Sequence, residues 1–111
     1  MDSLEVARLA TVEAALSSDA VIASSTSSIP ATAIGARAAR PDRVCVAHLV
    51  WPAHRTRFAE VAFPDVAGEG VRADLFNLLD ELAVTTLVTR DVPGFLITRL
   101  LLGYWGSALE L

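Results

Sequence analysis

The first part of the chain alternates between segments with helical and strand-like hydrophobic patterns. Residues 20–24 (AVIAS) form a short apolar run, typical of a parallel strand that is covered on both faces. After the polar turn at 25–30, the sequence ATAIGARAAR predicts a helix over 31–40. An amphipathic helix is predicted before the strand, because apolar residues recur at helical spacing at Val6, Leu9, Val12 and Leu16.

The second part predicts two strands in succession, followed by a helix, a strand and a long apolar helix. The strands are expected at 44–50 and 58–63, joined by the loop at 51–57, and a later strand at 85–89. The apolar helix is expected over residues 95–111. Between the strands, a helical stripe begins after Val71 and consists of Leu75, Leu78, Leu79 and Leu82. The order α-β-α-β-β-α-β-α predicts an α/β layer structure with one antiparallel strand pair.

Two polar residues interrupt the strands where the pattern calls for apolar side chains. His48 shares a strand face with Val46 and Val50, and Glu60 lies between Phe58 and Ala62 on one face of the next strand. Burying an unpaired carboxylate costs several kcal/mol, so two such exceptions suggest a pair. If the two strands run antiparallel, His48 and Glu60 come within reach of each other.

The pair has a structural and a catalytic interpretation. A buried histidine can simply satisfy a buried acid, and spacing alone leaves this interpretation open. In a catalytic site, the histidine would act as general base while the carboxylate fixes its tautomer and stabilises the imidazolium. The second histidine, His54, lies in an arginine-flanked loop and is expected in solvent. The hydroxyl cluster at 24–28 is by default strand-end and capping chemistry.

Length, charge and cysteine content narrow the class of protein. The 111 residues suit one small folded domain, and 53% hydrophobic against 20% charged residues predicts a packed core. The net charge is −4 and the nine cations, all arginine, are scattered, which argues against a nucleic-acid partner. The single cysteine, Cys45, excludes an internal disulfide and a cysteine metal site, and is predicted to be a buried thiol. No metal site is expected.

Neither end of the chain carries a pattern that predicts membrane insertion. The N-terminus lacks the basic start and apolar run of a signal peptide. The longest apolar stretch, residues 95–105, contains Arg99 and is too short to span a bilayer. We therefore expect a cytoplasmic protein with no membrane partner.

One glycine motif has the spacing of a phosphate-binding loop. GEGVRA at 68–73 fits the pattern G-x-G-x-x-[GA] and opens a helix. A dinucleotide loop needs a strand that leads directly into the first glycine, whereas Pro64 and Asp65 break the chain earlier, and Glu69 would repel a pyrophosphate. A flexible loop before a helix is the better interpretation.

Four segments together resemble the L-3-hydroxyacyl-CoA dehydrogenase family, which includes short-chain 3-hydroxybutyryl-CoA, carnitine and gulonate dehydrogenase relatives. They are ASSTSSIP, VAH, FAEV and RDVPGFLITRL, and the likeness covers nearly the whole chain. The resemblance implies NAD as cofactor and an acyl-CoA or hydroxy-acid substrate. It implies that His48 is the general base, that Glu60 pairs with it, and that Ser27 and Thr98 lie near the substrate.

The chain departs from the family pattern at several positions. Trp51 stands before Pro52 in place of the family's asparagine, and Thr98 replaces the asparagine that helps to hold substrate. The family's glycine-rich βαβ unit is not found in the sequence, so cofactor-binding residues cannot be assigned. The resemblance implies that residues 1–91 are the second half of a Rossmann-type NAD-binding domain. Residues 92–111 would then be the first helix of an all-α C-terminal dimerisation domain.

Two functional interpretations therefore stand beside each other. The first is that the chain is part of an enzyme that catalyses NAD-dependent oxidation of a 3-hydroxyacyl-CoA or similar hydroxy acid. The alternative is a non-catalytic truncated fragment or interaction subunit that retains only the fold. In both cases we expect the isolated chain to be inactive and to bind NAD weakly, because backbone N–H groups in a glycine-rich turn supply much of the pyrophosphate affinity. The apolar C-terminal helix predicts self-association or a homo-oligomer.

Overall fold

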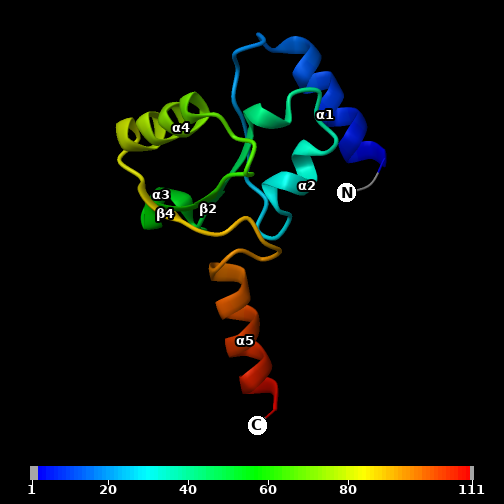
Figure 1. Cartoon of the computed structure of the whole chain (residues 1–111). Helices are drawn as coiled ribbons and strands as arrows, with labels where there is room; N and C mark the ends of the chain where they lie inside the picture. Colours follow the sequence, from blue (N-terminus) through cyan, green and yellow to red (C-terminus); the bar gives the residue numbers. More distant parts are fainter. Residues whose placement is uncertain (1–2, 111) are drawn as a thin grey trace.

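In this computed structural model, which describes residues 3–110, helices lie on both sides of a small sheet and one helix extends away from it (Figure 1). The predicted order of helices and strands is confirmed, with two short helical turns added. In chain order the elements are α1 (Ser3–Ala15), β1 (Ile22–Ser24), α2 (Ala31–Gly35), the 3₁₀ turn η1 (Pro41–Arg43), β2 (Val44–Leu49), α3 (Ala53–Thr56), β3 (Phe58–Ala62), α4 (Glu69–Glu81), β4 (Thr85–Val88) and α5 (Ile97–Leu109).

The sheet joins two parallel pairs through one antiparallel contact. Within the described residues it has four strands in the order β1-β2-β3-β4. β1 and β2 are parallel, as are β3 and β4, while β2 and β3 are antiparallel. Parallel neighbours need a crossover connection, which α2 and α4 provide. The predicted α/β class with one antiparallel pair is confirmed.

Strand alternation separates the core into two clusters, one on each face of the sheet. Cys45, Ala59 and Val61 face α4, and pack with its buried residues Val71, Leu75 and Leu79. The neighbouring strand positions face α2, where the buried residues are Ala31, Ile34, Val44, Val46, Ala62 and Phe95. The period of two therefore determines which side chains meet which helix.

The helix predicted over residues 31–40 is much shorter than expected, because its second half forms turns whose last N–H groups bind another helix. α2 ends at Gly35, and hydrogen bonds with three-residue spacing follow it, from Arg37 N to Ile34 O and from Ala38 N to Gly35 O. The Glu13 carboxylate on α1 accepts hydrogen bonds from the N–H groups of residues 39 and 40. These N–H groups are thereby satisfied outside a helix.

Three smaller expectations were also wrong. The loop at 51–57 contains the one-turn helix α3. Leu78 and Leu82, expected in the apolar stripe, are 52% and 55% exposed. The residues of α4 that are buried against the sheet are instead spaced four apart: Val71, Leu75 and Leu79. β1 is not covered on both faces: Ala23 is exposed, and within the described residues β2 is its one strand neighbour.

The C-terminal helix α5 packs little against the rest of the described chain. It projects from the sheet as a separate rod (Figure 1) and has no buried residue. Its large apolar side chains are exposed around the helix, at Leu100, Leu101, Leu102, Tyr104, Trp105 and Leu109. A membrane-crossing helix would need more length and apolar character than any helix within residues 3–110 has.

Candidate functional site

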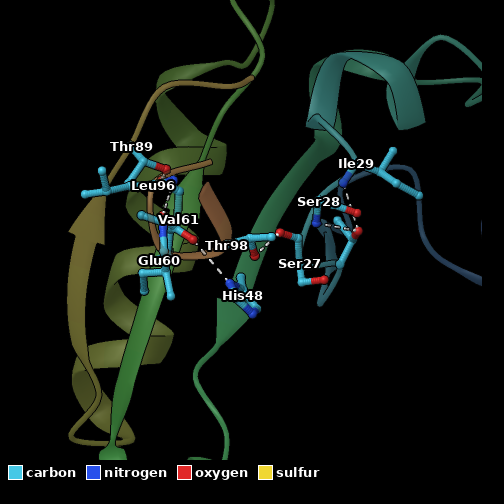
Figure 2. A network of polar contacts seen from close by, with 11 residues as sticks. Ser27, Ser28, Ile29, His48, Glu60, Val61, Thr89, Leu96 and Thr98 are labelled. Carbon is cyan, nitrogen blue, oxygen red and sulfur yellow. Dashed lines mark hydrogen bonds and ion pairs between the residues drawn. The ribbon is translucent and has the colours of Figure 1, made fainter. Parts of the chain in front are cut away.

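His48 and Glu60 lie directly opposite each other in the antiparallel register of β2 and β3. His48 Nδ1 is 3.2 Å from Glu60 Oε1, and the two side chains point toward each other in Figure 2. The Glu60 side chain is fully buried, and that of His48 is 15% exposed. The prediction that the two polar exceptions form a pair is confirmed.

The other carboxylate oxygen of Glu60 is held by the backbone at the start of α5. Oε2 accepts hydrogen bonds from Leu96 N at 2.7 Å and Ile97 N at 3.0 Å. A tight turn aims these N–H groups at the sheet: Gly94 and Phe95 have φ values of +74° and +45°. A Cβ on Gly94 would approach the Arg99 side chain to 3.0 Å, so glycine suits this position. Phe95 fixes the turn through its buried side chain.

The loop after β1, residues 25–30, is attached to the same turn and is called the serine loop below. Thr98 Oγ1 donates a hydrogen bond to the Ser27 carbonyl at 2.7 Å, and Gly94 N donates to the Ser28 carbonyl at 2.8 Å. The loop is also braced internally, because Thr26 Oγ1 accepts from the N–H groups of Ser28 and the following isoleucine (Figure 2). Ser27 and Thr98, which the sequence analysis placed near the substrate, are thus brought into contact with each other.

Asp91 connects the start of α2 to the segment that leads into α5. Its carboxylate accepts hydrogen bonds from Ala31 N, Thr32 N and Thr32 Oγ1, at 2.5, 2.8 and 2.6 Å. These backbone groups are among the N–H donors that a helix leaves unpaired at its N-terminus. Residues 91–98 therefore contact the helix α2, the loop before it and the buried carboxylate.

This arrangement presents one histidine nitrogen for chemistry. When neutral His48 donates its Nδ1 proton to Glu60, Nε2 keeps a lone pair that can accept a proton. The hydrogen bond to Glu60 orients the ring. His54, by contrast, is exposed on α3, as expected.

The helix N-termini of the described residues do not meet the needs of a bound dinucleotide. GEGVRA does not follow a strand directly, since residues 63–68 separate β3 from α4, and a Cβ on Gly68 or Gly70 would meet open space. The N-terminus of α2 follows β1, but its N–H groups already bind the anionic Asp91. Neither of these two helix N-termini therefore offers a fitting set of donors to the pyrophosphate of NAD.

The cysteine and the acidic residues do not point to a metal. Cys45 is fully buried, and burial raises the pKa of its thiol to about 11 from an ordinary 9.0. Its Sγ lies 3.7 Å from the Ile22 carbonyl. In the part of the chain that the structure describes, no three His, Cys, Asp or Glu residues gather closely enough to bind a metal ion.

Sequence reasoning missed the backbone partners of Glu60 and the role of Asp91. The dipeptide Pro93-Gly94 before an apolar helix indicates a turn with free N–H groups beyond it, and this signal was available. Asp91 binds residues about 60 positions earlier, so no local pattern could have revealed its contacts.

Comparison with known proteins gives a consistent result for sequence and fold. The sequence model described as "3-hydroxyacyl-CoA dehydrogenase, NAD binding domain" matches residues 5–92. The fatty acid oxidation complex subunit alpha of Pseudomonas paraeruginosa is 34% identical over 103 residues, which are 93% of this chain and 14% of that protein.

Solved structures of similar proteins share the fold. The 5-formyl-3-hydroxy-2-methylpyridine 4-carboxylic acid 5-dehydrogenase, an NAD⁺-dependent dismutase, superposes with a TM-score of 0.90 at 27% identity, over 98% of this chain and 36% of its own. The 3-hydroxybutyryl-CoA dehydrogenase of Escherichia coli gives 0.85 at 25% identity, over 96% and 23%. The Rossmann-like fold is confirmed, and this chain spans only part of each relative.

Proposed function

Since the chain belongs to the 3-hydroxyacyl-CoA dehydrogenase NAD-binding-domain family, we propose that it carries the proton-transfer groups of an NAD-dependent oxidoreductase. The substrate would be a 3-hydroxyacyl-CoA or a similar hydroxy acid. The observation that supports this proposal best is the buried Glu60 carboxylate within hydrogen-bond distance of His48. A buried carboxylate behind a slightly exposed histidine is an arrangement that suits a general base.

In the proposed reaction, His48 Nε2 accepts the proton of the substrate hydroxyl as the carbinol carbon is oxidised to a ketone. Glu60 keeps the other ring nitrogen protonated and stabilises the imidazolium after proton transfer. NAD, the cofactor of the family, supplies the hydride acceptor when bound. The groups that anchor its pyrophosphate would lie outside residues 3–110, because the described helix N-termini do not fit it.

Ser27 and Thr98 would act at the substrate end of the same site. Thr98 donates its hydroxyl proton to the Ser27 carbonyl, so its role is to hold the serine loop against the start of α5. The Ser27 side chain is then available to contact the substrate. Threonine offers less hydrogen-bonding capacity than the family's asparagine, and part of it is used by this contact.

We also propose that residues 1–91 form the second half of the NAD-binding domain, and that α5 begins a helical domain from residue 92. The exposed apolar side chains of α5 would be covered by a second copy of the chain. Between Ile97 and Leu109 the helix carries one charged residue, Arg99, so two copies can pack with little burial of charge.

The enzymatic proposal can be tested in a chimera. This chain would replace the homologous segment of the Pseudomonas fatty acid oxidation complex subunit alpha, and oxidation of 3-hydroxybutyryl-CoA would be followed by NADH absorbance. His48→Gln should lower kcat by about 10²–10⁴-fold, the usual worth of a general base. His54→Gln is the matched control and should leave the rate unchanged. A His48→Gln chimera within twofold of the parent would contradict the proposal.

The same chimera separates the two functional interpretations. A folded chimera that is inactive with His48 intact would favour the non-catalytic alternative. Calorimetric titration of the unmodified 111-residue chain with NAD should show no tight binding. Micromolar affinity would show that the pyrophosphate anchor lies within the chain after all.

A further inference from the structure

We propose that the first turn of α5 positions the side chain at residue 60, so that an accepting carboxylate oxygen faces His48 Nδ1 in the native chain and an NH₂ group would face it in Glu60→Gln. This inference rests on the proposed role of His48 as a base, and it concerns how that base is kept in its active form. The start of α5 would then be a positioning element of the site, although its N–H groups need not touch substrate.

Each oxygen of Glu60 has its own set of partners. Oε2 receives two backbone N–H groups, from Leu96 and Ile97, and these groups can only donate. Oε1 faces His48 Nδ1. The Glu60 side chain is fully buried, so solvent cannot replace a missing partner. Because both carboxylate oxygens accept, the native pair requires a proton on Nδ1 and leaves Nε2 free.

The variant Glu60→Gln shows how the N–H groups of α5 orient the side chain at position 60. The amide of Glu60→Gln has one accepting oxygen and one donating nitrogen. With the oxygen toward His48, its NH₂ group would face two N–H donors and leave both unsatisfied in a buried place. With the oxygen toward α5, both backbone donors are satisfied and the NH₂ group faces Nδ1. His48 must then accept at Nδ1 and carry its proton on Nε2.

The positions of the two backbone donors are themselves constrained. The turn at Gly94 and Phe95 precedes them, and Gly94 N is bonded to the Ser28 carbonyl. Thr98, one residue further along the helix, is bonded to the Ser27 carbonyl. The loop proposed to contact the substrate and the base are therefore linked through one short segment, residues 94–98 (Figure 2). A displacement of α5 would disturb both.

Nuclear magnetic resonance of the full chain can measure the tautomer directly. The chain has two histidines, so ¹⁵N-histidine labelling gives two imidazole pairs, and exposed His54 is an internal control. At a pH where both rings are neutral, wild-type His48 should be the Nδ1–H tautomer. In Glu60→Gln it should be the Nε2–H tautomer, while His54 stays unchanged. The amide protons of Leu96 and Ile97 should stay protected from exchange with solvent in both proteins.

If the amide oxygen of Glu60→Gln faces His48 instead of α5, the His48 tautomer and the exchange of the Leu96 and Ile97 amide protons both give the opposite result. Retention of the Nδ1–H tautomer, together with rapid exchange at Leu96 and Ile97, would overturn the inference. If the variant fails to fold, the wild-type chain still decides: an Nε2–H tautomer or unprotected amides there would contradict it. A tautomer switch in Glu60→Gln, together with a chimera that is inactive although it has His48 and Glu60, would count against the proposed function alone. An active chimera, together with no tautomer switch in Glu60→Gln, would count against this inference alone.

Discussion

Asp91 should contribute measurably to stability, because it satisfies the start of a very short helix. α2 has five residues and no side-chain cap from its own N-terminal neighbour. Its first N–H groups, on Ala31 and Thr32, depend on the Asp91 carboxylate, and Ala31 is fully buried. Removing the carboxylate would leave these donors without a partner.

The expected loss can be worked out from these contacts. Loss of a helix cap costs about 1 kcal/mol, within a range of roughly 0.5–2 kcal/mol. A buried donor left unsatisfied costs about 1–3 kcal/mol. Because the two costs describe partly the same N–H groups, we expect Asp91→Ala to lower the free energy of unfolding by about 2–3 kcal/mol. Asp91→Asn keeps one accepting oxygen but loses the charge, so a loss of about 1 kcal/mol is expected.

Urea unfolding followed by tryptophan fluorescence and circular dichroism would measure these differences. Asp74→Ala is the matched control, since Asp74 is exposed on α4, and its effect should stay within about 0.5 kcal/mol. The order expected is Asp91→Ala, then Asp91→Asn, then the control. An Asp91→Ala variant as stable as the control would refute the reasoning, since it would show that α2 does not depend on this carboxylate.

Three further predictions concern the core, the serine loop and α5. Burial raises the pKa of Cys45 from 9.0 to about 11, so the unfolded chain releases its thiol proton first as the pH rises. Between pH 9 and 11 the wild type should therefore lose about 2 kcal/mol more stability than Cys45→Ala, and equal losses would contradict the burial argument. Thr98→Val removes the hydrogen bond to Ser27 and should lower kcat/KM of the chimera about 2–10-fold, whereas Thr98→Asn, which restores the family residue, should raise it. Leu102→Glu should reduce self-association in light scattering while Leu78→Glu, at a similarly exposed leucine on α4, should not; an unchanged mass for Leu102→Glu would place the contact elsewhere.

Local patterns in the chain were enough to predict the order of the main elements and the central pair of the site. Periods of two and of about 3.6 residues are local properties, so the strands at 44–50 and 58–63 and the helix after Val71 could be predicted without coordinates. His48 and Glu60 could be found because a polar residue on an apolar strand face needs a partner. The resemblance to the dehydrogenase family added the expected roles of the residues and the cofactor.

Contacts between distant segments could be seen only in the folded chain. α2 stops at Gly35, and Glu13, on another helix, accepts hydrogen bonds from the N–H groups of residues 39 and 40 in the turns that follow. The second oxygen of Glu60 is bound by α5, and Asp91 binds a helix about 60 residues earlier. Hydrogen bonds of this kind follow from the relative placement of whole elements, and no local spacing encodes that placement. The sequence could therefore indicate that Glu60 needs a partner, but only the fold shows that it has partners on both sides.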